Sequence, residues 1–277
     1  MAFAPPRADA STAQQWFEDT TTVDGDFRTL LEQYSHIDPD KVVSHVVGTR
    51  NRAWAVHPYP CLGQFRFLEL NLAKRGLYKN LLASLKEEGS TKSKFLDIGC
   101  CLGQDVRKLI HDGAPSSTVV GAELNPAFLE IGYDLFKDQD CVTMLALNIL
   151  DDPPLALKGT FTSVQLGMIL HLFTWDEQVA AFRNTIQLLQ AHTGVRIFGQ
   201  ATGNLDGTPT ASVHGTRATF KHNGESFRRL VEQVSATTGT NWRVVTAELD
   251  NGLSIFDGKR TWDDPKTRRL VFDVERL

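Results

Sequence analysis

The sequence predicts an α/β fold in which a doubly wound, mainly parallel sheet of seven strands follows a helical N-terminal segment. Two observations support this. Beyond residue 91, short apolar runs alternate with segments whose apolar residues recur at helical spacing. Before residue 90, only helical patterns occur. Regular alternation of strands and helices is typical of a parallel sheet with helices on both faces.

The front of the chain divides into two parts. Residues 1–26 are rich in Ala, Pro, Ser and Thr, and we expect a flexible arm there. Residues 27–90 have helical spacing but no strand of their own, so we expect a helical lid over the carboxyl ends of the strands. Helical patterns are found at residues 26–37, 38–54 and 61–87.

The remaining residues, 91–277, are predicted to form the sheet domain. The helix after Asn125 begins with Pro126, a residue that favours the first helical turn. We expect the long polar segment 199–224 to be a loop that gates the site. The expected strands are 94–99, 117–124, 141–150, 161–170, 194–200, 242–249 and 268–275, and the expected helices are 103–113, 126–138, 175–190 and 224–239.

Composition excludes several classes of protein. With 277 residues and 42% hydrophobic content, the chain can bury a sizeable core. Its 29 Lys+Arg against 33 Asp+Glu lack the basic surplus of a nucleic-acid binder. No run approaches the roughly 18 apolar residues of a membrane span. The four cysteines form no CxxC pair, so we expect no metal and a cytoplasmic protein, and we leave the choice between monomer and homodimer open.

The end of the first expected strand indicates the cofactor. A dinucleotide site would need G-x-G-x-x-G, but Cys101 stands where the second glycine belongs after Gly99. Asp97 and Asp105 would repel a phosphate. S-adenosylmethionine carries no phosphate and has a cationic end, which suits these acids, while Gly103 permits close approach of the backbone. The expected cofactor contacts from this turn are Asp97, Gly99, Cys100 and Gly103.

The second and third strand ends extend this prediction. Glu123 can accept hydrogen bonds from both ribose hydroxyls, and Leu124 would line the adenine pocket. Asn148 can offer its carbonyl oxygen to the adenine amino group, with Ile149 as an apolar neighbour, although an Asn here also suits a turn cap.

The fourth strand end is expected to face the methyl group. His171 lies there among apolar residues, and we predict it as the catalytic and acceptor-binding residue. It would hold a carboxylate or a phenol oxygen, or take a phenolic proton as a base. A purely structural histidine is equally compatible with these neighbours.

Aromatic residues around one cation mark the expected acceptor pocket. In the stretch HPYPCLGQFRFLEL, Tyr59, Gln64 and Arg66 would suit an aromatic or terpenoid carboxylic acid. Gln200 and His222 are further candidates, from the fifth strand and the polar segment after it. For each residue of the aromatic stretch, core packing remains the alternative.

Several motifs resemble those of a known family. DIGCCLGQD, DGAP and GYDLF occur in order, with YPCLGQFRFLEL upstream and HLFTWDEQ and FKHNGESF downstream. This pattern is similar to fungal secondary-metabolite methyltransferases of the class I, Rossmann-like fold, especially carboxyl O-methyltransferases of meroterpenoid pathways, over about residues 27–250. The resemblance implies S-adenosylmethionine as cofactor and a small acid or phenol as acceptor. It also implies cofactor contacts at residues 123–124 and 148–149, although Asn148 stands where the family usually has Asp.

The sequence therefore predicts an S-adenosylmethionine-dependent enzyme that methylates a small organic acid and releases S-adenosylhomocysteine. Three alternatives remain: a phenolic O- or N-methyltransferase, a methyltransferase acting on a macromolecule, and a binding module that retained the fold without catalysis. The excess of acidic over basic residues disfavours RNA as substrate. The binding module is disfavoured because the expected cofactor residues are all present, namely Asp97, Gly99, Gly103 and Glu123.

Overall fold

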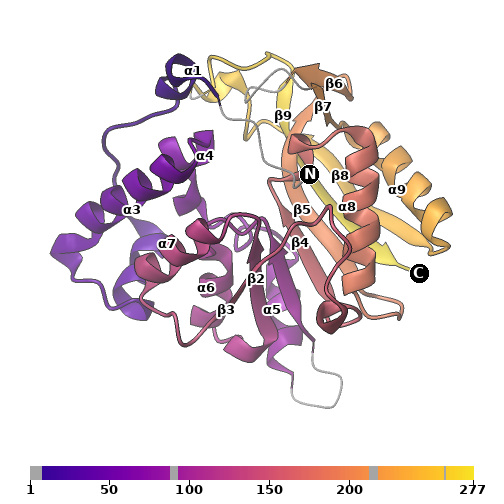
Figure 1. Cartoon of the computed structure of the whole chain (residues 1–277), viewed down its shortest axis with the longest axis horizontal. Coiled ribbons are helices and arrows are strands. Elements are labelled where there is room, and N and C mark those ends of the chain that lie inside the picture. Colours follow the sequence, from indigo (N-terminus) through magenta and orange to yellow (C-terminus); the bar gives the residue numbers. More distant parts are fainter. Residues whose placement is uncertain (1–7, 88–92, 212–217, 259) are drawn as a thin grey trace. The chain divides into compact units, whose positions relative to one another are not determined.

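The computed structural model describes residues 8–87, 93–211, 218–258 and 260–277. It contains a seven-stranded sheet with strand order β3-β2-β1-β4-β5-β9-β8, and a helical region precedes the first strand (Figure 1). This confirms the predicted fold class. The described chain forms two compact units, residues 8–147 and residues 148–277.

The first unit ends in three parallel strands with helices between them. β1 pairs with β2 and β2 with β3, always in parallel. Helix α7 begins at Pro126, and the side chain of Asn125 accepts a hydrogen bond from the Ala127 N–H at 3.0 Å. The bounds are β1 Phe95–Ile98, α6 Gln104–His111, a 3₁₀ turn at Ser116–Thr118, β2 Val119–Glu123, α7 Pro126–Phe136 and β3 Thr143–Ala146.

The helical region before β1 is more broken than the sequence suggested. The helical spacing predicted for residues 61–87 is realised only in short, separate pieces. Phe65 and Leu70 adopt left-handed backbone angles, with φ of 54° and 43°, which a right-handed helix cannot include. The elements of this region are α1 Ala10–Gln14, α2 Gly25–Thr29, a π-helical turn at Leu30–Tyr34, a 3₁₀ turn at Pro39–Lys41, α3 Val42–Val56, α4 Pro60–Gly63, a 3₁₀ turn at Arg66–Glu69 and α5 Tyr78–Lys86.

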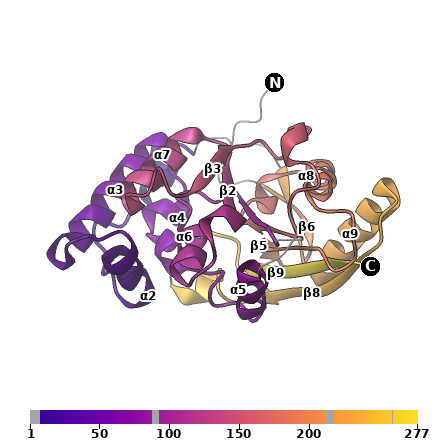
Figure 2. The same ribbon diagram turned by 90° about the horizontal axis from the view of Figure 1, so that it is seen from below.

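Within the first unit, one apolar core joins the N-terminal helical region to the turn after β1 and to helix α7. Figures 1 and 2 both show α3 beside α7. Side chains from Val23 to Leu70 pack in one cluster with Leu102 of the turn after β1 and with residues of α7. Trp16, within the stretch expected to be a flexible arm, is only 1% exposed. The proposed division into an arm at residues 1–26, a lid at 27–90 and a sheet domain at 91–277 stays a prediction.

The second unit holds the other four strands of the sheet. β4 pairs with β5 in parallel, whereas β9 is antiparallel to both β5 and β8. Helices α8 and α9 pack against each other, and each begins with a capping box. The bounds are β4 Ser163–Gly167, α8 Trp175–Leu188, β5 Arg196–Asn204, α9 Gly224–Thr238, β8 Trp242–Asp250 and β9 Thr267–Arg276, with 3₁₀ turns at Leu155–Leu157, Leu170–Leu172 and Ile255–Asp257.

The segment predicted as a polar loop covers residues 199–224, of which 212–217 lie outside the described residues, and most of the described remainder forms strands. β5 continues to Asn204, and β6 (Thr208–Ala211) pairs in antiparallel fashion with β7 (Ala218–Lys221). Alternating Thr residues suit such a hairpin, but the polar composition concealed it. Throughout the described ranges, every helix is too short or too polar to cross a bilayer.

Candidate functional site

The turn after β1 is a tight loop closed against β2. The N–H groups of Gly99 and Cys100 both donate to the carbonyl oxygen of Ala122, at 2.8 and 3.1 Å. Gly99 and Gly103 have φ of 76° and 72°, which glycine adopts freely. Cys101 has φ of 53°, a left-handed conformation that strains a residue with a side chain. Such strain is concentrated at functional sites.

The carboxylate of Glu123, at the end of β2, is fixed beside this turn. It accepts hydrogen bonds from the N–H groups of Cys101 at 3.1 Å, Leu124 at 2.7 Å and Asn125 at 3.3 Å. Burial raises the pKa of Glu123, and these donors oppose the shift. A carboxylate accepts about four hydrogen bonds, so the three donors seen in the part of the chain that the structure describes leave capacity for one more. The long contact from Asn125 is the one most readily exchanged for a ligand hydroxyl.

The other predicted cofactor residues of this turn are buried. Asp97 lies within β1 and Cys100 in the turn that follows, and each is 3% exposed. Burial raises the pKa of the Cys100 and Cys101 thiols well above the usual value, so both remain protonated at neutral pH. Neither thiol is therefore activated as a nucleophile, which agrees with a turn and packing role.

Tyr59 of the aromatic stretch lies in the same unit as Glu123. Its ring is 4.1 Å from the ring of His57 and 6.0 Å from that of Phe128, centroid to centroid. Burial, followed by the charge of Glu123, raises the pKa of Tyr59 above its usual value. The structure thus brings this predicted acceptor residue within electrostatic range of a predicted cofactor residue.

Arg66 and Gln64 were predicted to contact the acceptor, with Arg66 as the cation that binds its carboxylate. The Arg66 guanidinium lies 3.3 Å from a carboxylate oxygen of Glu69, one turn further along the chain. An acceptor carboxylate would have to compete with Glu69 for this charge. Gln64 is buried, with 7% of its surface exposed.

In the second unit, Asn148 caps a turn. Its carbonyl oxygen accepts from the Leu150 N–H at 3.1 Å and its amide donates to Asp151 at 3.0 Å. Asn184, buried on α8, donates to the carbonyl oxygens of Ile149 and Asp151, both at 2.9 Å. Asn184 was not predicted from the sequence, although an amide on the apolar face of the helix expected at residues 175–190 could have indicated it. One lone pair of the Asn148 carbonyl remains for a ligand.

His171 lies in the turn after β4 with a defined orientation. Its Nδ1 accepts a hydrogen bond from the Thr202 N–H at 3.3 Å, so in this arrangement the ring proton is on Nε2. Met168, just before it, has a strained left-handed φ of 56°, and its N–H donates to the Gln200 carbonyl oxygen at 2.8 Å. His171 thus lies in the turn that follows β4, and Gln200, another predicted residue, lies on the adjacent strand β5, where it pairs with Gly167.

His222 has the environment of a structural histidine. It is buried, with Nδ1 3.0 Å from the Ser226 hydroxyl and Nε2 2.8 Å from the Gln178 side-chain oxygen. Burial lowers its pKa to about 3. Both ring nitrogens are occupied by protein groups, and this favours a packing role over the predicted contact with the acceptor.

Within the described ranges, no group of three or more His, Cys, Asp or Glu side chains is arranged to hold a metal. Each unit therefore holds candidate residues of its own: the first has a glycine turn beside the fixed carboxylate of Glu123, and the second has the oriented ring of His171.

Solved structures with a similar fold include methyltransferases. A SAM-dependent methyltransferase from Leishmania major matches 99% of this chain and 97% of its own, with TM-score 0.51 and 15% identity. The Burkholderia thailandensis 1,6-didemethyltoxoflavin-N1-methyltransferase matches 84% and 90%, with TM-score 0.53 and 15% identity. The [4+2]-cyclase SpnF matches 83% and 93%, with TM-score 0.56 and 12% identity. These likenesses establish the fold alone, that of the class I methyltransferases.

Sequence relatives define the family. Residues 16–68 match the meroterpenoid methyltransferase N-terminal domain. O-methyltransferase phiE from a fungal species is 36% identical over 268 residues, covering 91% of this chain and 88% of phiE. O-methyltransferase atr3 of Stereocaulon alpinum is 39% identical, covering 90% and 72%, and methyltransferase ausD of Penicillium brasilianum is 35% identical, covering 85% of each. The chain belongs to this family of fungal O-methyltransferases, and it is a methyltransferase.

Proposed function

We propose that this methyltransferase transfers the methyl group of S-adenosylmethionine to the carboxylate of a small organic acid in fungal secondary metabolism. The products are a methyl ester and S-adenosylhomocysteine. We expect an aromatic, polyketide or terpenoid acid, because the predicted acceptor residues Tyr59, Gln64, Arg66 and Gln200 combine aromatic and polar side chains.

The residues around the glycine turn fit this cofactor. The fixed carboxylate of Glu123 has capacity for a ribose hydroxyl, and Leu124 and Asn148 would lie against the adenine. Asp97 adds a carboxylate at the end of β1 where a phosphate would be repelled and a cation favoured. When bound, S-adenosylmethionine supplies an electrophilic methyl group on a sulfonium.

The single observation that favours a carboxylate acceptor is the hydrogen bond from Thr202 to His171. Because Nδ1 accepts, Nε2 carries the proton and can donate to a carboxylate oxygen. In this tautomer Nε2 cannot take up a phenolic proton. A carboxylate is already ionised at pH 7, so the transfer needs no base. His171 would hold one carboxylate oxygen and so orient the other oxygen towards the methyl group that S-adenosylmethionine would supply.

The test combines product chemistry with two variants. Incubation with methyl-labelled S-adenosylmethionine and a panel of aromatic and terpenoid acids should give label that mild base releases. Base-stable label would instead indicate a phenol or amine acceptor.

A donor role for His171 also predicts how its variants rank. His171→Ala should lower kcat/KM for the acid about 10- to 100-fold through loss of a hydrogen bond to a charged group. His171→Gln retains an N–H donor but no base and should recover part of this loss. If both variants are equally inactive while S-adenosylhomocysteine still binds, His171 acts as a base and the carboxylate assignment is contradicted.

A further inference from the structure

Arg107 of α6 is a fully buried cation, 0% exposed. Its Nε and Nη2 donate to the two carboxylate oxygens of Asp138 at 2.8 and 2.9 Å. Its Nη1 donates to the carbonyl oxygens of Leu102 and Gly103 at 3.2 and 3.4 Å. A buried ion pair persists only when its remaining donors are also satisfied, and here the turn after β1 supplies those acceptors.

This arrangement gives Gly103 a second role. A Cβ at this position would lie 2.2 Å from Nη1 of Arg107 and 2.3 Å from the end of the Met144 side chain. A side chain at residue 103 would therefore push the ends of Arg107 and Met144 aside, and Arg107 is held in place by Asp138, so this packing favours glycine independently of any ligand. Arg107 in turn holds the carbonyls that follow the strained Cys101, whose N–H donates to Glu123.

The same carboxylate extends to the N-terminal helical region. The Tyr34 hydroxyl donates to Asp138 at 2.7 Å. Tyr34 is the last residue of the π-helical turn Leu30–Tyr34, and such turns often occur at functional sites. Burial, and then the hydrogen bond to Asp138, raises the pKa of Tyr34, so its hydroxyl stays protonated as a donor.

We propose that Tyr34, Asp138 and Arg107 form a positioning chain that couples the N-terminal helical region to the shape of the cofactor turn at residues 101–103. None of the three needs to touch the ligand. The proposal rests on the proposed function in taking S-adenosylmethionine as the ligand of this turn. It implies that loosening the helical region at Tyr34 weakens cofactor binding from a distance.

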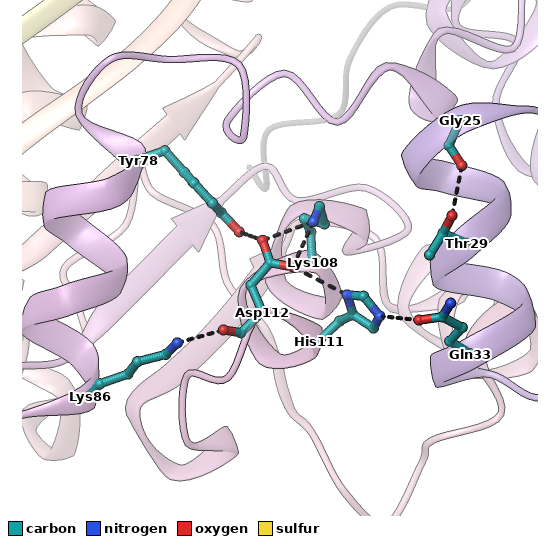
Figure 3. Close-up of polar contacts among 8 residues, drawn as sticks. All are labelled: Gly25, Thr29, Gln33, Tyr78, Lys86, Lys108, His111 and Asp112. Carbon is teal, nitrogen blue, oxygen red and sulfur yellow. Dashed lines mark hydrogen bonds and ion pairs between the residues drawn. The ribbon is translucent and has the colours of Figure 1, made fainter.

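The chain itself offers a matched control. Tyr78 also donates its hydroxyl to an aspartate at 2.7 Å, but this partner is Asp112 at the far end of α6 (Figure 3). Tyr34→Phe and Tyr78→Phe each remove one hydroxyl from a Tyr–Asp hydrogen bond of the same length. Only Tyr34→Phe interrupts the positioning chain.

Calorimetric titration with S-adenosylhomocysteine should show about 3- to 10-fold weaker binding for Tyr34→Phe and less than a 2-fold change for Tyr78→Phe. For Tyr34→Phe, KM for S-adenosylmethionine should rise while kcat at saturation changes less than 2-fold. Amide hydrogen exchange at residues 101–103 should accelerate in Tyr34→Phe alone.

Similar thermal destabilisation of both variants, with unchanged affinity and unchanged exchange at residues 101–103, would overturn the proposal and leave Tyr34 a purely structural residue. If wild-type protein does not bind S-adenosylhomocysteine, the proposed function fails instead. The exchange measurement still decides whether Tyr34 is coupled to the turn, because it needs no ligand.

Discussion

Helix α6 connects two clusters of the same composition, each with a basic residue of the helix, an aspartate and a tyrosine. One comprises Arg107, Asp138 and Tyr34, and the other comprises Lys108, Asp112 and Tyr78. We call the first the inner cluster and the second the outer cluster. The side chains of the cation and the carboxylate are 0% and 6% exposed in the inner cluster, and 12% and 21% exposed in the outer cluster. Two clusters whose cations are consecutive residues of one helix thus differ in burial, and we expect the buried ion pair to matter more for stability.

The outer cluster closes the C-terminal end of α6. Lys108 and His111 contact the Asp112 carboxylate, and Lys86 donates to the Asp112 carbonyl oxygen at 2.6 Å (Figure 3). Cations near a helix C-terminus are favoured by the helix dipole. These contacts join the helix to α5, and Nε2 of His111 also lies 3.4 Å from the side-chain oxygen of Gln33 in the π-helical turn (Figure 3). None of them involves residues 101–103, so we expect them to affect stability and not ligand binding.

The largest effect that distinguishes the inner from the outer cluster is expected from Arg107→Met. The variant keeps much of the side-chain volume but leaves Asp138 buried without its cation, so the free energy of unfolding should fall by about 3–5 kcal/mol. Urea denaturation measures this change. Adding Asp138→Asn to the variant should restore part of the loss, because the unpaired charge is then removed. A loss below about 1 kcal/mol would show that the inner pair resembles a surface ion pair.

A smaller effect is expected from Asp112→Asn in the outer cluster. Burial alone would raise the pKa of Asp112, but hydrogen bonds from Lys108, Tyr78 and His111 outweigh it and hold the pKa below its usual value. A carboxylate with a lowered folded-state pKa stabilises the protein above its unfolded pKa, and this contribution disappears as the pH falls through the folded value.

The difference in unfolding free energy between wild type and Asp112→Asn should therefore be under about 1 kcal/mol at pH 6 and smaller at pH 3. Chemical denaturation at the two pH values measures it. A difference that grows towards pH 3 would mean that the neutral acid is the stabilising form, contrary to the contacts seen.

The sequence was most informative where local signals suffice. The seven sheet strands follow apolar runs, and α7 starts at its predicted proline. The helical region was less predictable because Phe65 and Leu70 adopt left-handed angles that bulky residues rarely take. Tertiary packing imposes these angles, since both side chains are buried in the core shared with α7.

In the candidate site, too, residues marked by local sequence were predicted, whereas those that depend on tertiary contacts were not. Glu123 was predicted from its place at a strand end, and the structure fixes its carboxylate beside the glycine turn. Arg107 and Asp138 were missed because each resembles an ordinary charged helix residue, and their pairing spans 31 positions. Gly103 was attributed to the cofactor alone because nothing in the sequence shows that Arg107 folds back over it.

The measurement that tests the account most directly is a calorimetric titration of wild type and Glu123→Ala with S-adenosylhomocysteine. The account predicts one site per wild-type chain, and binding about 10- to 100-fold weaker in the variant through loss of charge-assisted hydrogen bonds. Equal affinity of the two proteins, or failure of the wild type to bind, would contradict it.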